Sequence, residues 1–150
     1  VYKRQALNVD RMAQFYVHTG MIGLDGVKMS KSLGNLVFVH KLVGAGEDPS
    51  AIRLGVFAGH YRDERDWSDE VLDAAKRRLA AWREALEQPG SMAGAEEVVA
   101  KLRAAIANDL DTPAALAAVD EWAEADRGTD EDGAADLVRT ALNSLLGVQA

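Results

Sequence analysis

The decapeptide GVKMSKSLGN, residues 26–35, decides how the rest of the chain is interpreted. It holds two Lys and two Ser within five residues, with a Gly on either side: Lys28, Ser30, Lys31 and Ser32, between Gly26 and Gly34. Ammonium groups suit a polyphosphate, and they can stabilise the charge that develops on a leaving pyrophosphate. The flanking glycines would let the loop close over a ligand and reopen. From residue types alone, the alternative is a basic surface loop that meets only solvent.

The charge distribution of the chain points to the same segment. The 150 residues carry 17 basic and 24 acidic side chains, which gives a net charge of −7. Residues 1–46 hold six basic and two acidic side chains, a net charge of +4, whereas residues 47–150 hold 11 and 22, a net charge of −11. An anion site therefore belongs in the first third. The acidic remainder is a poor surface for a polyanion, because each phosphate contact needs a Lys or Arg.

Several kinds of site are excluded by what the sequence lacks. Without Cys, these residues form neither a disulfide nor a thiolate zinc site. His18, His40 and His60 are spaced by 22 and 20 residues, which fits no metal motif, so structural roles are expected for them. Gly44-Ala45-Gly46 lacks the third Gly of a dinucleotide fingerprint, and the chain has no P-loop motif. No apolar run approaches the ~20 residues of a membrane span and no signal peptide is visible, so we expect no membrane contact and a cytoplasmic localisation.

The pattern divides the chain into three parts. Val1–Gln5 lacks an initiator Met and is interpreted as a non-native scar. Residues 6–67 form a mixed segment around the decapeptide, and residues 68–150 are predicted to be helical throughout. Within the mixed segment the predictions are a helix over residues 6–18, a short β-branched strand over residues 36–39, and a helix from Pro49 to about Ala58 with Asp48 as its N-cap.

Four amphipathic helices are predicted after Trp67. The first begins after Ser68 as N-cap and ends before Pro89-Gly90, and the others cover residues 94–108, a stretch from Thr112 as N-cap, and residues 131–146 with Gly147 as C-cap. Helices of this kind joined by short loops predict a bundle, so the fold class is mainly α. Trp67, Trp82 and Trp122 are expected as core anchors, and Asp109 and Asp111 as helix caps.

Lys28-Met29-Ser30-Lys31-Ser32 is also the complete KMSKS signature of class I aminoacyl-tRNA synthetases, and the segment resembles that family further. His18-Thr19-Gly20 and Asp25-Gly26 before it, and Gly34-Asn35 after it, are similar to the family's sequence around this loop. The resemblance implies that residues 6–67 are the end of a nucleotide-binding, Rossmann-like catalytic domain. It also implies a ligase that joins an amino acid to AMP and releases pyrophosphate.

Within the class, the resemblance is to the cysteine enzymes. The stretch around Lys28 and Asp109-Leu110-Asp111-Thr112-Pro113 are similar to cysteinyl-tRNA synthetases. The likeness is closer to the ligases that join cysteine to glucosaminyl-inositol in mycothiol biosynthesis. It covers the chain from about Ala6 and is carried by residues 17–26 (VHTGMIGLDG), 34–39 (GNLVFV), 49–55 (PSAIRLG), 58–62 (AGHYR) and 145–148 (LLGV).

This resemblance implies a set of roles. Lys28, Ser30 and Lys31 would be catalytic, and the ATP contacts would come from Ile22, which binds adenine through its backbone, and from Lys28, Met29, Ser30, Lys31 and Ser32. The family's zinc, which recognises the cysteine thiol, would be held upstream of Ala6. The family's HIGH motif does not occur in these residues, so the chain alone is expected to be inactive.

The expected substrates are ATP, cysteine and glucosaminyl-inositol, and the enzyme is expected to be a monomer. The acidic helical part favours a small acceptor over tRNA. Two alternatives remain open at this stage. One is a cysteine–tRNA ligase, and the other is a non-catalytic helical interaction module that retains the loop.

Overall fold

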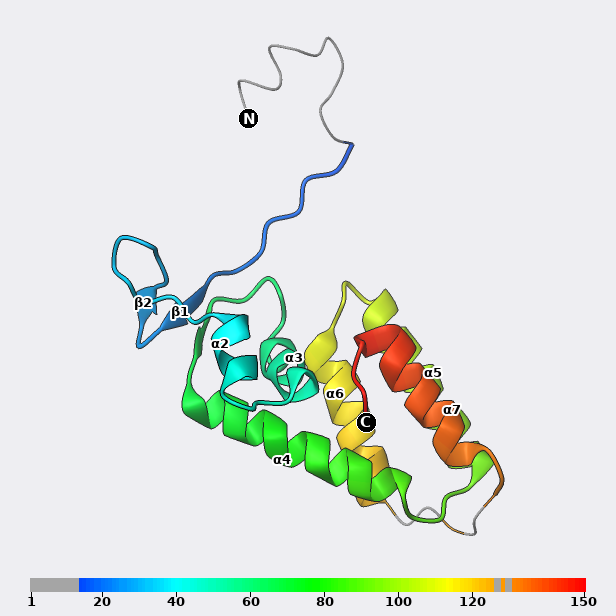
Figure 1. Ribbon diagram of the computed structural model, residues 1–150. Helices are drawn as coiled ribbons and strands as arrows, with labels where there is room; N and C mark the ends of the chain where they lie inside the picture. Colours follow the sequence, from blue (N-terminus) through cyan, green and yellow to red (C-terminus); the bar gives the residue numbers. More distant parts are fainter. Residues whose placement is uncertain (1–13, 126–127, 129–130) are drawn as a thin grey trace.

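The computed structural model describes residues 14–125, 128 and 131–150 (Figure 1). A small sheet and two short helices precede a group of longer helices, and the hairpin of the sheet projects away from those helices (Figure 1). Helices outweigh strands throughout, which confirms the prediction of a mainly α chain.

Three short strands form the sheet, in the order β2-β1-β3. The strands are β1 (Ile22–Leu24), β2 (Val27–Lys28) and β3 (Arg65–Trp67). β1 pairs antiparallel with β2 through the Asp25-Gly26 turn and parallel with β3, so Gly23 lies opposite both Lys28 and Asp66. Asp25 and Gly26 both have positive φ, as a two-residue hairpin turn requires.

The strand predicted at residues 36–39 is wrong. The chain is irregular up to Phe38, and α2 (Val39–Gly44) begins where the strand was expected to end. Val37 and Leu42 both pack against the core, and a short helix between them allows this. Burial of these side chains outweighs the β propensity of a four-residue run.

The helix predicted over residues 6–18 is wrong in its last part, because residues 14–18 are not helical. Phe15 and Val17 are 84% and 65% exposed, so this apolar segment has no surface among the described residues against which a helix could pack. The rest of that prediction, and the interpretation of Val1–Gln5 as a scar, lie outside the described residues.

The remaining helices follow the prediction closely. They are α3 (Pro49–Phe57), α4 (Asp69–Leu86), α5 (Met92–Ala107), α6 (Thr112–Glu124), α7 (Ala134–Ala141) and the π-helical turn η1 (Leu142–Leu146). Asp48 and Ser68 cap α3 and α4 as predicted, and Gly147 ends η1 with φ 65°. The cap of α6 is Asp111, which accepts from the Ala114 amide. This confirms the prediction of Asp111 as a helix cap, whereas the prediction of Thr112 as the N-cap is wrong.

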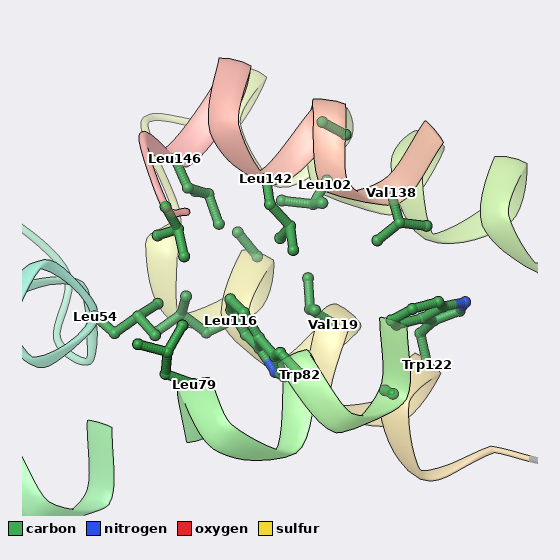
Figure 2. Close-up of a cluster of buried hydrophobic side chains, with 14 of the residues drawn as sticks. Leu54, Leu79, Trp82, Leu102, Leu116, Val119, Trp122, Val138, Leu142 and Leu146 are labelled. Carbon is green, nitrogen blue, oxygen red and sulfur yellow. The ribbon is translucent and has the colours of Figure 1, made fainter. Parts of the chain in front are cut away.

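One core joins α3, β3 and all the later helices (Figure 2). Trp82 is fully buried at its centre with Leu54, Leu116 and Leu142. Trp67 and Trp122 are 7% and 9% exposed, so all three Trp side chains are core residues as predicted. The Trp82 indole donates to Asp120 Oδ1 (2.8 Å), which also accepts from Arg78 Nε (3.0 Å), and α4 is thereby tied to α6.

Large apolar side chains on the surface are concentrated before α3. Among the described residues, nine of the eleven lie in residues 15–43, and the other two are Val56 and Leu110. None of the helices in the described part of the chain combines the length and the apolar character needed to cross a bilayer.

Candidate functional site

The base of the KMSKS loop is fixed by Asp66 on the neighbouring strand. Asp66 lies opposite Gly23 in the parallel pair, and its Oδ2 accepts from the Gly26 amide at 2.6 Å. A Cβ at Gly23 would collide with Asp66 Oδ1, so the carboxylate reaches the hairpin turn only across a glycine. The backbone amide of the turn is therefore held by a side chain from 40 residues later in the chain.

Asn35 closes the loop from its other end. Its Oδ1 accepts from the Ser30 amide (2.9 Å) and its Nδ2 donates to the Lys28 carbonyl (3.3 Å). Inside the loop, the Gly34 amide donates to the Lys31 carbonyl (3.3 Å), and Gly34 has a φ of 69°, which favours glycine. The loop thus has a defined turn, held at both ends by side chains outside the KMSKS pentapeptide.

The side chains of the pentapeptide divide into anchoring and free groups. Met29 is half-buried and packs against the core. Ser30 Oγ accepts from the Leu33 amide at 3.3 Å and lies 3.2 Å from Ser32 Oγ, so one of these hydroxyl protons is available to an incoming acceptor. Lys28 and Lys31 are exposed, and neither pairs with a carboxylate of the described residues.

A shallow hollow of about 410 Å³ lies beside the hairpin. Its lining comes from both sides of β1: Met21, Gly23, Gly26, Val27, Lys28, Glu64, Arg65 and Asp66. The hollow combines exposed backbone, one exposed ammonium group and the edge of a small sheet. Such a surface can present hydrogen bonds and positive charge to one side of a ligand.

The predicted site residues lie in one segment of the chain, but their side chains do not all face the same side. Lys28, Ser30, Lys31 and Ser32 lie together on the loop, whereas Ile22 lies in β1, half-buried and packed against the core. The Ile22 backbone is in register with Arg65 of β3. The structure therefore places the Ile22 side chain against the core and leaves its backbone at the sheet.

Sequence reasoning missed Asn35 and Asp66 as shaping residues. Asn35 was visible as part of Gly34-Asn35, but nothing in the sequence shows that its amide bridges two backbone groups. Asp66 was hidden because β3 is only three residues long and follows a polar turn. Asp109, expected as a helix cap, pairs instead with Arg62 at 2.6 Å. Its φ of 53° directs the chain out of α5, so Asp111 takes the capping position.

Metal ligands are not grouped in this part of the protein. Across residues 14–125, 128 and 131–150, no three His, Asp or Glu side chains come together as a metal site would require. His60 Nε2 lies 3.0 Å from the Asp109 carbonyl, a structural contact of the kind expected for it.

Comparison with known proteins decides the family. Residues 2–77, about half of the chain and including the whole loop, match the catalytic domain of class I (C) tRNA synthetases. The chain belongs to this class I synthetase family. The match runs past Trp67 into α4, so it includes the sheet, α2 and α3.

Curated members of the family extend the match to nearly the whole chain. The L-cysteine:1D-myo-inositol 2-amino-2-deoxy-alpha-D-glucopyranoside ligase of Corynebacterium aurimucosum is 64% identical over 146 residues, 96% of this chain. The proteins of that name from Corynebacterium jeikeium (ligase 2) and Saccharomonospora viridis are 58% and 60% identical over 96% and 91% of the chain. The chain spans about a third of the length of these relatives, 35%, 35% and 34%. The resemblance to the cysteine:glucosaminyl-inositol ligases is thereby confirmed.

Proposed function

We propose that this chain is the C-terminal part of an ATP-dependent ligase that activates cysteine as cysteinyl-AMP and transfers it to the amine of glucosaminyl-inositol. The observation that carries the proposal is the 64% identity to a ligase of that name over 96% of the chain. The intact KMSKS loop also supports it, because its two ammonium groups pair with no carboxylate of the described residues and can therefore contact phosphate.

In the first step, a carboxylate oxygen of cysteine attacks the α-phosphorus of ATP. The bond from that phosphorus to the bridging oxygen breaks, and pyrophosphate leaves with the negative charge. Lys28 and Lys31 stabilise this charge, and the Ser30 hydroxyl donates a hydrogen bond to a phosphate oxygen. Met29 anchors the loop to the core, and the Ser32 hydroxyl lies beside that of Ser30. The Ile22 backbone binds the adenine.

In the second step, the amine of glucosaminyl-inositol attacks the acyl carbon of cysteinyl-AMP. The carbon–oxygen bond to AMP breaks, an amide forms, and the amine loses a proton to a base or to water. The chain alone is proposed to be inactive, because the HIGH half of the site is absent from its sequence. The zinc that the family uses for the cysteine thiol is assigned to residues upstream of Ala6.

The exposed apolar side chains support the assignment to a longer protein. Nine exposed large apolar side chains within residues 15–43 are unusual for a surface that meets only water. In the longer ligase, this face would be covered by the preceding part of the nucleotide-binding domain. The boundary between that domain and the helical bundle is proposed at residues 67 and 68, and the ligase is proposed to be a cytoplasmic monomer.

A cysteine–tRNA ligase is the second candidate, since the matched family model is that of the class I (C) tRNA synthetases. The net charge of −11 on residues 47–150 favours the small acceptor. The deciding experiment loads the full-length protein with cysteine and ATP and then offers either glucosaminyl-inositol or tRNA. Consumption of glucosaminyl-inositol alone is expected, and consumption of tRNA alone would overturn the choice of acceptor. A helical interaction module is the third candidate, and a full-length protein that is folded but forms no cysteinyl-AMP would favour it.

A further inference from the structure

We propose that Asp109 is a positioning residue for the KMSKS loop, acting through the turn at residues 60–63. The inference rests on the proposed function only for its consequence in catalysis, since the coupling itself is structural. Asp109 lies in the α5–α6 connection and the turn lies between α3 and β3, side by side at one end of the helices (Figure 1).

The Asp109 carboxylate is held by both neighbours in the turn. Tyr61 Oη donates to Oδ1 at 2.6 Å, and Arg62 donates through Nε to Oδ2 (2.6 Å) and through Nη2 to Oδ1 (3.0 Å). The Arg62 guanidinium also lies over the Tyr61 ring, 5.0 Å from its centre. A two-point Arg–carboxylate contact fixes direction as well as distance, so the turn is oriented by the bundle and not only attached to it.

The same turn supports the strand that leads into the loop. The Gly20 amide donates to the Tyr61 carbonyl (2.8 Å), and the Arg65 amide donates to the Met21 carbonyl (3.0 Å). A Cβ on Gly20 would collide with the Asp63 carbonyl, so the strand and the turn are in direct backbone contact. β1 begins at Ile22, two residues after Gly20, and the KMSKS pentapeptide begins at Lys28, the last residue of its hairpin partner β2. A displacement of the turn is therefore passed through β1 to the start of the loop.

Further hydrogen bonds connect the turn to three neighbouring segments. Arg65 donates through Nη1 to the His60 carbonyl (2.9 Å) and through Nη2 to the Val56 carbonyl (2.7 Å). His60 Nε2 lies 3.0 Å from the Asp109 carbonyl. The turn is thereby held to the end of α3, to β3 and to the α5–α6 connection at once.

The backbone at Asp109 is consistent with a positional role. Asp109 and Leu110 have φ of 53° and 56°, a left-handed conformation that is uncommon for residues other than Gly, Asn and Asp. Leu110 is 54% exposed, so burial of its own side chain does not explain the conformation. The conformation is the one that turns the Asp109 carboxylate towards Tyr61 and Arg62.

The experiment compares Asp109→Gly with two controls. Glycine keeps the left-handed backbone while it removes the carboxylate, so the loss is confined to the contacts with the turn. Leu110→Gly makes the same backbone change at the next residue without touching the carboxylate. Asp120→Asn weakens another carboxylate–Arg contact, which lies wholly within the bundle.

The first measurement is native-state amide hydrogen exchange on the 150-residue chain. In Asp109→Gly, the Gly20 and Gly26 amides should exchange about tenfold faster, as expected for the loss of charge-assisted hydrogen bonds, while core amides such as that of Leu102 change less. Leu110→Gly and Asp120→Asn should leave the ratio of loop to core exchange unchanged. Equal acceleration of all amides in Asp109→Gly, or none at Gly20, would overturn the proposal.

The second measurement links the coupling to catalysis. In a chimera, this chain replaces the matching segment of the Corynebacterium aurimucosum ligase, and cysteine-dependent ATP–pyrophosphate exchange is measured. Asp109→Gly should raise the KM for ATP about tenfold, whereas a variant that merely unfolds in part lowers kcat at constant KM. If the Gly20 amide lost its protection from hydrogen exchange but the KM for ATP stayed unchanged, only the catalytic consequence would be overturned. The two proposals can fail separately. If Lys31→Ala did not change ATP–pyrophosphate exchange while Asp109→Gly still accelerated hydrogen exchange at the Gly20 amide, the proposed function would fail and the structural coupling would stand.

Discussion

Asp66 and Asn35 hold the KMSKS loop through backbone atoms, while Lys28 and Lys31 remain exposed and unpaired among the described residues. Shape and charge are therefore supplied by different residues. Asp66 accepts from one backbone amide, and Asn35 bonds one amide and one carbonyl. The charged groups stay free for a ligand, which is what an electrostatic role in phosphate chemistry needs.

Asp109 predicts a specific response to acid. Hydrogen bonds from Arg62 and Tyr61 lower the pKa of the Asp109 carboxyl from 3.8 to about 2, and the groups facing it are the Arg62 guanidinium, the His60 ring and the neutral Tyr61 hydroxyl. Because the folded pKa is depressed, the stabilisation is complete above pH 4 and is lost as the pH falls towards 2. Asp109→Asn should therefore reduce the dependence of the unfolding free energy on pH between 4 and 2, measured by urea titration. An identical slope in the variant and the parent would contradict the assigned contacts.

Gly20 predicts a steric effect of a single methyl group. In Gly20→Ala the new Cβ meets the Asp63 carbonyl, so the strand and the turn must separate, at a cost of about 1–3 kcal/mol in the free energy of unfolding. Gly44→Ala is the matched control, because a Cβ there meets open space at the end of α2. Urea unfolding of both variants tests this, and equal stability of the two would show that the close approach at Gly20 is incorrect.

At the scale of elements, the cap of α6 gives a direct test. Asp111 Oδ1 accepts from the Ala114 amide at 3.0 Å, and Thr112 is already the first helical residue. Asp111→Ala should lower the free energy of unfolding by ~0.5–2 kcal/mol, and Asp111→Asn by much less, since Asn is an equally good cap. Thermal unfolding followed by circular dichroism measures the difference. Equal losses in the two variants would mean that the charge of Asp111, and not its capping bond, stabilises the helix.

The longer helices could be predicted from sequence because local signals agree with the packing. Ser68 caps α4, Asp48 precedes Pro49 in α3, and buried Leu79 and Trp82 lie on one stripe. The strands could not be predicted in this way. β3 has three residues and is defined by its pairing with β1 across some 40 residues, and no local pattern records that pairing.

Two failures share a physical cause. The run at residues 36–39 has β propensity, but Val37 packs against the core and α2 begins at Val39. Phe15 and Tyr16 belong to the apolar pattern that predicted a helix, but both are exposed and the described residues offer them no surface to pack against. In both places tertiary contacts, or their absence, determine the backbone more strongly than the local sequence.

At the scale of the molecule, Trp82 links the bundle into one unit. It is fully buried and lies beside Leu116 from α6 (Figure 2). Its indole donates to Asp120. Trp82→Ala should lower the free energy of unfolding by about 3–5 kcal/mol. Trp82→Phe retains most of the packing and should cost clearly less. Denaturant titration with a single transition for all probes would support one shared core, whereas a loss below 1 kcal/mol in Trp82→Ala would argue against it.

The residue types of the loop were enough to propose a candidate site. Two Lys and two Ser at fixed spacing in a basic third of the chain indicate phosphate, and their family resemblance is now confirmed. Asn35, Asp66 and Asp109 could not be assigned, because their contacts span 5 to 48 residues of sequence and depend on turns with positive φ. The sequence therefore indicates the groups that would meet the ligand, and the fold reveals the groups that hold them.

Cysteine-dependent ATP–pyrophosphate exchange in the chimera with the Corynebacterium aurimucosum ligase tests whether the KMSKS loop binds the phosphates of ATP. Lys31→Ala removes one loop ammonium group, and Lys41→Ala removes an equally exposed one from α2, where it lies 5.2 Å from the centre of the Phe38 ring. Loss of a group that stabilises the developing phosphate charge should slow exchange by about 10²–10³-fold in Lys31→Ala and leave Lys41→Ala within about twofold of the parent chimera. Exchange at the parent rate in Lys31→Ala would contradict the central claim that this loop binds the phosphates of ATP.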